Sequence, residues 1–255
     1  MGAIESFLQG GTRFMSESRF GRNLRDGYLR GTGIAYAGLA QAIRDESDYQ
    51  EALGLAGGLS GGRTICAEPR LMNLYLLIRF YAPKLTPGDI IEFGSYKGGS
   101  AIFMASLAKR YLSKARVWGL DTFEGMPDTD PSIDLHLRGD FGGVDFDALR
   151  AYVATIDLPN LTFVKGLFEA TTDDVLDQSQ NMVLAHIDCD IQSAIIYTWN
   201  RIKPRMVAGG YVVFDDATES SCLSATETVE RELIQKDGLS SEQIYPHYVF
   251  RYPPI

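Results

Sequence analysis

The sequence is poor in the features that mark several classes of protein. It has only three cysteines, Cys66, Cys189 and Cys222, too few and too scattered for a disulfide framework or a C-x-x-C metal clip. Its 24 basic residues face 33 acidic ones, a formal net charge of −9, so the clustered positive charge of a nucleic-acid-binding protein is missing. No run of 18 apolar residues and no signal peptide is visible. We therefore expect a cytoplasmic protein without nucleic-acid or membrane partners.

What the sequence does contain is a regular alternation of apolar strands and helices. A chain of 255 residues with 45% hydrophobic and 22% charged residues suits one α/β domain with an appendage. Strands are predicted at 90–94, 116–121, 161–165, 183–188, 211–215 and near 247–252, and helices at 100–111, 146–155, 172–178, 193–202 and 224–236. This alternation predicts a parallel sheet, which binds ligands at the carboxyl ends of its strands.

Residues 1–65 lack this alternation. Their Arg-rich helical patches and small-residue stretches predict a helical cap that also provides oligomer contacts, and residues 66–255 form the main domain. An apolar helix over 71–80, ended by Pro83, leads into the first strand. The polar, glycine-bearing insertion 128–145 is predicted to be a lid, because loops over the carboxyl edge of a sheet often close on a substrate and exclude water.

The segment from Ile90 to Ile102 predicts a ligand loop, because an apolar strand ends there in a glycine turn and continues as a helix. Glycine lets the backbone approach a ligand closely, and a helix N-terminus presents unpaired N–H groups. The spacing matches neither G-x-G-x-x-G nor G-x-x-x-x-G-K-[ST], which disfavours dinucleotide and ATP phosphate cradles. With Glu92 two positions before Gly94, it reads E-x-G-x-x-x-G-G, the strand-one pattern of methyltransferases that bind S-adenosylmethionine. The alternative is a tight strand-to-helix turn without a ligand.

Carboxylates gather at the predicted strand ends. Asp121 ends the second strand, where a carboxylate can accept both hydroxyl protons of a ribose diol. Gly166 and Phe168, after the third strand, could border an adenine, the glycine giving room and the phenyl ring an apolar wall.

A second group of carboxylates follows the fourth and fifth strands. Asp188 and Asp190 end one strand, and Asp215 and Asp216 end the next. Clustered carboxylates repel one another, and a divalent cation holds them ionised together; oxygen ligands favour Mg²⁺, Mn²⁺ or Ca²⁺ over zinc. In the alternative interpretation, Asp190 and Asp216 cap the following helices and the others are solvated.

Four motifs together resemble the macrocin O-methyltransferase family. They are IEFGSYKGGS at 91–100, LDTFEGMP at 120–127, DCD at 188–190 and GGYVVFDD at 209–216. The resemblance implies an α/β, Rossmann-like class I methyltransferase fold, with a mostly parallel seven-stranded sheet, helices on both faces and an N-terminal helical cap. It also implies S-adenosylmethionine- and metal-dependent methylation of a hydroxyl on a natural-product sugar, in secondary metabolite biosynthesis.

The resemblance also implies roles for individual residues. Asp188, Asp215 and Asp216 would bind the metal, and Asp188 would also take the proton of the acceptor hydroxyl; His136, in the lid, could supply a second base or a hydrogen bond. Predicted cofactor contacts are Glu92, Gly94, Ser95, Tyr96, Gly99, Ser100, Asp121, Thr122, Phe123, Gly166, Phe168 and Asp188. Gln192 and Ala217 stand where the family often has aromatic residues, so the frame for metal and cofactor carries over better than the acceptor pocket.

Two other functions remain open. One is a metal-independent methyltransferase that modifies a nitrogen or carbon of a small metabolite. The other is a non-catalytic protein that retains the cofactor pocket as a relic. For the enzyme, the expected partners are a small hydroxylated acceptor, which could be a sugar, a phenol or another metabolite, and further copies of the chain in a homo-oligomer.

Overall fold

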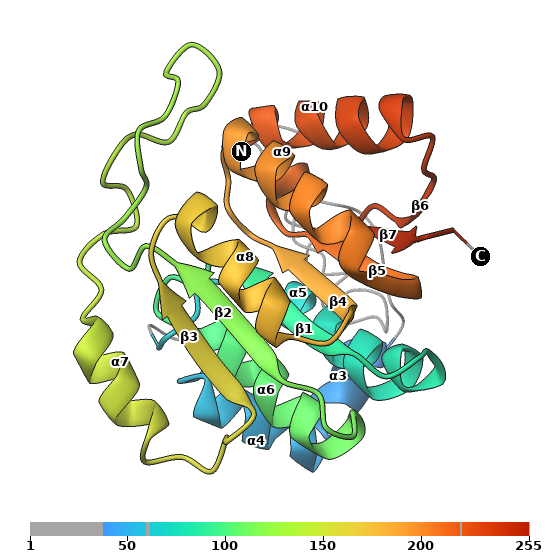
Figure 1. The fold of residues 1–255 in the computed structure, drawn as a ribbon. Coiled ribbons are helices and arrows are strands. Elements are labelled where there is room, and N and C mark those ends of the chain that lie inside the picture. Colours follow the sequence, from blue (N-terminus) through green and yellow to red (C-terminus); the bar gives the residue numbers. More distant parts are fainter. Residues whose placement is uncertain (1–37, 60–61, 220, 255) are drawn as a thin grey trace, which may run out of the picture.

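The computed structural model describes residues 38–59, 62–219 and 221–254 and contains a seven-stranded sheet (Figure 1). The strands are β1 (Asp89–Phe93), β2 (Val117–Asp121), β3 (Leu161–Lys165), β4 (Met182–Ile187), β5 (Met206–Phe214), β6 (Ser241–Gln243) and β7 (Tyr248–Tyr252). Their order is β3-β2-β1-β4-β5-β7-β6. The first five are parallel, while β7 runs antiparallel to both β5 and β6. The predicted α/β fold with a mostly parallel seven-stranded sheet is confirmed.

Helices cover both faces of this sheet. The α-helices of the described residues are α3 (Leu39–Arg44), α4 (Ser47–Leu55), α5 (Glu68–Leu76), α6 (Gly99–Tyr111), α7 (Phe146–Val153), α8 (Phe168–Gln178), α9 (Gln192–Ile202) and α10 (Leu223–Val229). Two π-helical turns, Leu77–Tyr81 and Glu230–Lys236, extend α5 and α10, and 3₁₀ turns lie at Ala82–Lys84, Lys203–Arg205 and Asp216–Thr218. None of the described helices is long and apolar enough to cross a bilayer.

The sheet separates two hydrophobic cores. Side chains of successive strand residues point to opposite faces, so Ile90 packs with α4, α5 and α6, while Ile91 packs with α8, α9 and α10. Both residues are fully buried, as expected for a central parallel strand covered by helices on both faces. The helix layers on the two sides can be followed in Figure 1.

The predicted helical cap is described only in part. Helices α3 and α4 fall within residues 1–65, while residues 1–37, 60 and 61 lie outside the described residues. Helix α4 packs directly on α6, and the ring of Tyr49 meets that of Phe103 edge to face at 5.7 Å. This part of the cap shares its hydrophobic core with the main domain, and its role in oligomer contacts stays a prediction.

The start of α6 is covered by the segment 62–66. The amide of Gly99 donates to the carbonyl of Arg63 at 3.2 Å, and a Cβ at Gly99 would lie 2.5 Å from the amide nitrogen of Thr64. One of the N–H groups expected to face a ligand is therefore used inside the protein. Glycine is required here because the segment and the helix are in backbone contact.

Three elements differ from the sequence prediction. Helix α8 begins at Phe168, four residues before the predicted start, and β5 begins at Met206, because its two glycines, Gly209 and Gly210, masked the strand pattern. Strand β6 has only three residues, too few for an alternating pattern to be visible. The other predicted strands and helices are present with bounds within two residues, except that α5 begins at Glu68, three residues before the predicted start, and that π-helical turns replace the ends of the helices predicted at 71–80 and 224–236.

Candidate active site

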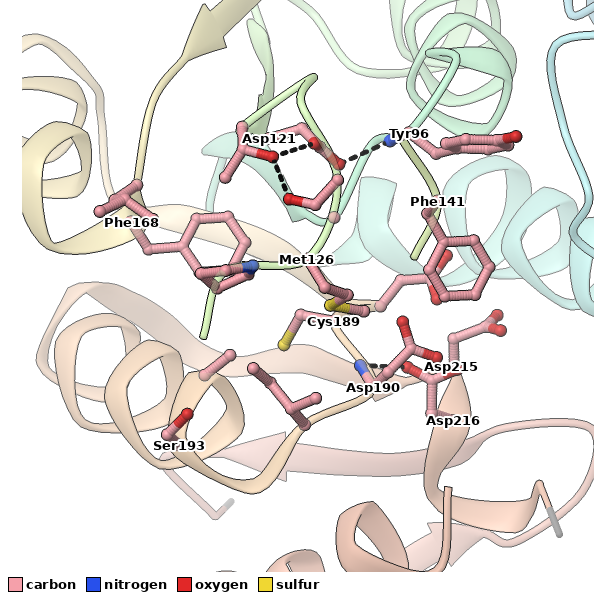
Figure 2. Close-up of a pocket in the computed structure, with 18 of the residues that line it drawn as sticks. Tyr96, Asp121, Met126, Phe141, Phe168, Cys189, Asp190, Ser193, Asp215 and Asp216 are labelled. Atoms are coloured by element: carbon pink, nitrogen blue, oxygen red, sulfur yellow. Dashed lines mark hydrogen bonds between the residues drawn. The ribbon is translucent and has the colours of Figure 1, made fainter. Parts of the chain in front are cut away.

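A pocket with a cavity volume of about 190 Å³ lies at the carboxyl ends of the parallel strands. Figure 2 shows Asp121 and Tyr96 on one side, Asp190, Asp215 and Asp216 on the other, and the rings of Phe168 and Phe141 at the flanks. The lining residues are Ile65, Cys66, Arg70, Gly94, Tyr96, Asp121, Thr122, Gly125, Met126, Pro127, Phe141, Leu167, Phe168, Glu169, Asp188, Cys189, Asp190, Ile191, Ser193, Ala194, Asp215 and Asp216. The structure therefore brings many of the predicted site residues into one cavity.

Gly94 allows the ends of β1 and β4 to approach each other. Its φ is +93°, and a Cβ at this position would lie 1.6 Å from the carbonyl oxygen of Asp188. On the same edge, the amide of Asp188 donates to the carbonyl of Phe93 at 2.9 Å. No residue with a Cβ fits at this position. The backbone contact therefore keeps the loop after β1 close to Asp188, the first acidic residue after β4.

Asp121 fixes the other wall of the pocket. One carboxylate oxygen accepts the amide of Tyr96 at 2.7 Å, and the other accepts the amide of Phe123 at 2.6 Å. Burial raises the pKa of Asp121, while these two amides act to lower it. Asp121 thus holds the glycine loop and the segment after β2 together while it lines the pocket.

Several predicted cofactor residues do not line the pocket. They are Glu92, Ser95, Gly99, Ser100, Phe123 and Gly166. Glu92 is fully buried, where it accepts the Ser95 hydroxyl at 2.6 Å and lies 3.0 Å from Nδ1 of His186. Phe123 stacks on Phe146 with the ring centroids 4.5 Å apart. The contact of these six residues with a cofactor stays a prediction.

The opposite wall is strongly acidic. Among the described residues that line the pocket, six are acidic and Arg70 is the one cation. Burial raises the pKa of Asp188 well above its ordinary value, and the charges of Asp215 and Asp216 add to the shift. Burial, Asp190 and Asp215 raise the pKa of Asp216 in the same way. The wall therefore favours a positively charged ligand.

Asp215 differs from the other carboxylates because it has cationic and hydrogen-bonding partners. It forms an ion pair with Arg70, and Nε2 of His247 lies 2.7 Å from its Oδ1. Burial acts to raise its pKa, but His186, His247 and Arg70 outweigh burial and lower it well below the ordinary value. Burial lowers the pKa of His247 to about 4, whereas Asp215 and Glu92 outweigh burial at His186 and raise its pKa to about 9.

His136 lies beside the pocket, although it is outside the lining. Its Nε2 is 3.6 Å from Oδ1 of Asp190 and 3.6 Å from Sγ of Cys222. The lid that carries it reaches towards the start of α9 (Figure 1). Asp134 in the same loop accepts the amide of Gln192 at 3.0 Å and the hydroxyl of Ser224 at 2.7 Å. The predicted lid is therefore attached to the acidic side of the pocket.

Comparison with known proteins connects this site with a family. The sequence profile described as Macrocin-O-methyltransferase (TylF) matches residues 41–239, more than three quarters of the chain. The chain belongs to the macrocin O-methyltransferase family. The predicted resemblance is confirmed, and as a member of this family the protein is an S-adenosylmethionine-dependent methyltransferase.

Two curated relatives of the protein are O-methyltransferases that are named for natural products. The 8-demethyl-8-(2,3-dimethoxy-alpha-L-rhamnosyl)-tetracenomycin-C 4'-O-methyltransferase of Streptomyces olivaceus is 28% identical over 176 residues, 65% of this chain and 67% of the relative. The mycinamicin III 3''-O-methyltransferase of Micromonospora griseorubida is 25% identical over 201 residues, 70% and 73% of the two chains. The solved structure of the O-methyltransferase NovP superposes with a TM-score of 0.66 at 23% identity, over 85% of this chain and 95% of that one, and shows the shared fold.

Sequence reasoning missed part of the macrocin O-methyltransferase site. Arg70, on α5, and His247, before β7, both contact Asp215, and neither has a local pattern that marks it. Cys66 lines the pocket without a local pattern that marks it, and Met126 lines it from the LDTFEGMP motif, in which it had been given no role. Asp190, which the sequence places in the acidic group or alternatively as a helix cap, lines the pocket, and its amide donates to Asp216 Oδ2 at 2.9 Å. The DCD motif contained the only signal for it.

Proposed function

We propose that the protein transfers the methyl group of S-adenosylmethionine to a hydroxyl of a natural-product sugar or a related small molecule in secondary metabolism. The observation that carries this proposal is the pocket with two unlike walls, one built on Asp121 and the glycine loop, the other on buried carboxylates. The relatives support the acceptor class, since their names describe methylation of sugar hydroxyls on tetracenomycin and mycinamicin scaffolds.

The cofactor would occupy the wall formed by Tyr96, Asp121, Thr122 and Phe168. The carboxylate of Asp121 is held by two amides and lines the cavity, so it can accept a ribose hydroxyl without reorganising. The ring of Phe168 is held edge to face against Phe93 at 5.3 Å and offers an apolar surface for an adenine. When bound, the cofactor supplies an electrophilic methyl group on a cationic sulfonium, which suits the six acidic residues of the pocket.

Asp188, Asp215 and Asp216 would hold a hard divalent cation, Mg²⁺ or alternatively Mn²⁺ or Ca²⁺, by moving closer together, because this trio is not among the described groups whose ligand atoms all lie within 4.8 Å of one another. Their oxygens are the ligands that such ions prefer, and the raised pKa values of Asp188 and Asp216 mark buried carboxylates with too little positive charge nearby. Asp215 already has Arg70 and His247, which would orient it for this role. When bound, the cation supplies positive charge that favours loss of a proton from the acceptor hydroxyl.

The chain itself would place the acceptor oxygen and take its proton. Methyl transfer is an in-line displacement, so the two reacting atoms must be brought to about 3 Å from each other and aligned. Asp188 lies between the glycine loop and the other carboxylates, and burial raises its pKa, so its carboxylate is a stronger base than an exposed one. Asp190 lines the same cavity and is the second carboxylate within reach of an acceptor.

The test uses Asp188→Ala, with Asp190→Asn beside it. We expect Asp188→Ala to abolish methyl transfer and to leave the affinity for S-adenosylhomocysteine, measured by titration calorimetry, nearly intact. Full activity of Asp188→Ala would refute its role. If Asp190→Asn alone is inactive, the proton acceptor is Asp190 instead. Activity that is unchanged by EDTA would refute the metal and favour the metal-independent methyltransferase.

A further inference from the structure

A second group of possible metal ligands lies between the lid and the acidic wall. It consists of His136 from the lid, Asp190 after β4 and Cys222 at the start of α10. The sulfur of Cys222 is 3.3 Å from Oδ1 of Asp190 and 3.6 Å from Nε2 of His136, and these last two atoms are 3.6 Å apart. Three donor atoms from three distant segments thus form a nearly equilateral triangle.

This triangle has the dimensions of one face of a zinc coordination tetrahedron. Bond lengths of about 2.0 to 2.3 Å and tetrahedral angles place neighbouring oxygen, nitrogen and sulfur ligands about 3.3 to 3.6 Å apart. Two other such groups lie among the described residues: His186, Asp188 and Asp215, which overlaps the proposed magnesium site, and Cys66, Asp215 and His247, which fits zinc less well. There the nitrogen of His247 and the oxygen of Asp215 are 2.7 Å apart, a hydrogen-bond distance that is too short for two ligands of one zinc ion.

The surroundings of His136 are those of a metal ligand. Its other nitrogen, Nδ1, lies 3.4 Å from Oδ2 of Asp140, and that carboxylate oxygen accepts the amide of Leu137 at 2.9 Å. A carboxylate on the far nitrogen is the usual partner of a metal-binding histidine, because it fixes the tautomer and the ring orientation. The side chains of His136 and Asp190 are 18% and 14% exposed, and Cys222 is buried, so the donors are shielded without being sealed off.

We propose that His136, Asp190 and Cys222 bind a borderline divalent cation, Zn²⁺ by preference, which fastens the lid to the acidic wall of the pocket. A mixed sulfur, nitrogen and oxygen set selects zinc over magnesium. As the Zn–S bond forms, the thiol of Cys222 releases its proton to the solvent, and the two other ligands bind through lone pairs. Asp190 lines the pocket, so a water molecule can take the fourth position. The site shares no ligand with the proposed magnesium site and does not depend on it.

The experiment measures Zn²⁺ binding by the full chain. The protein is stripped with EDTA, exchanged into metal-free buffer and titrated with Zn²⁺ against a chromophoric chelator, with millimolar Mg²⁺ present throughout. We expect one tight equivalent in the wild type, and an affinity at least about tenfold lower in Cys222→Ser and in His136→Gln, because loss of an outer-shell partner alone costs that much. Cys66→Ser is the matched control and should bind as the wild type does.

A second measurement reports on the lid directly. Arg138 is exposed within the lid, two residues after His136, and offers a trypsin site. Zn²⁺ should slow cleavage after Arg138 in the wild type and in Cys66→Ser, but not in Cys222→Ser. Co²⁺ should give the sulfur charge-transfer band of a thiolate ligand in the same two proteins. Equal Zn²⁺ affinity in all four proteins, or a loss confined to Cys66→Ser, would overturn the proposal, and the trio would then be a hydrogen-bonded contact only.

Discussion

Replacement of Gly94 by alanine tests the close approach of β1 and β4 on which the site is built. The backbone at this position is left-handed, and the added Cβ would lie 1.6 Å from the carbonyl oxygen of Asp188. The obstructing atom belongs to the backbone, so it cannot move aside by a change of rotamer. We expect the ends of the two strands to separate and the hydrogen bond from Asp188 to Phe93 to weaken.

The size of the effect follows from two contributions. The left-handed conformation costs a residue with a Cβ about 1–2 kcal/mol. Forcing an extra methyl group into a packed interior costs about 1–3 kcal/mol, and the rigid obstacle places Gly94→Ala at the upper end. We therefore expect a loss of about 4 kcal/mol in the free energy of unfolding, a large share of the roughly 5–15 kcal/mol of a typical domain.

Urea unfolding and titration calorimetry with S-adenosylhomocysteine are the assays. Gly238→Ala is the control, because Gly238 also has a positive φ, of +69°, but has open space where its Cβ would be. The control should lose only about 1 kcal/mol, from the conformation alone, and should bind the ligand as the wild type does. If Gly94→Ala unfolds within 1 kcal/mol of Gly238→Ala and binds the ligand equally well, the two strand ends are not in contact.

Three further predictions concern the charged groups around the pocket. Arg70→Met removes the guanidinium that pairs with Asp215 and should lower the free energy of unfolding by about 3 kcal/mol in EDTA, and Mg²⁺ should restore more stability to this variant than it adds to the wild type; equal effects of Mg²⁺ in urea titrations would contradict this. His186 has a pKa of about 9 in the folded protein against 6.5 unfolded, so its contribution of about 3 kcal/mol is complete below pH 6.5 and is lost as the pH rises to 9, a slope that His186→Asn should remove in unfolding curves recorded across this range. Asp121→Asn should weaken S-adenosylhomocysteine binding about tenfold in calorimetry, because an amide cannot accept both ribose hydroxyls; unchanged affinity would place the ribose elsewhere.

The sequence was sufficient to predict the fold and the sheet edge that carries the site. Hydrophobic strands alternating with helices determine a parallel sheet, and residues at the ends of parallel strands must meet at one edge. Asp121, Asp188 and Asp215 were placed in this way, and all three line one pocket. The reasoning succeeded because these positions follow from local pattern and topology alone.

The remaining features depend on contacts between distant segments. Arg70 lies 145 residues before Asp215, and nothing in the pattern of α5 marks its guanidinium as a partner of that carboxylate. Glu92 lies in the predicted motif, but whether a strand residue faces the cavity or the interior depends on the register of β1 against β4, which buries it against His186. Strand periodicity identifies the two faces of a sheet, but it does not reveal which side chains at the end of a strand reach a ligand.

The position of β7 has a consequence for the order in which the site can assemble during synthesis. This strand inserts between β5 and β6, and His247 just before it provides the closest nitrogen to Oδ1 of Asp215. All five parallel strands and the glycine loop leave the ribosome earlier. A nascent chain that stops after β5 therefore has its cofactor wall, but in its acidic wall Asp215 has Arg70 and His186 and still lacks His247. We expect full methyl transfer only after residues 241–252 have been made.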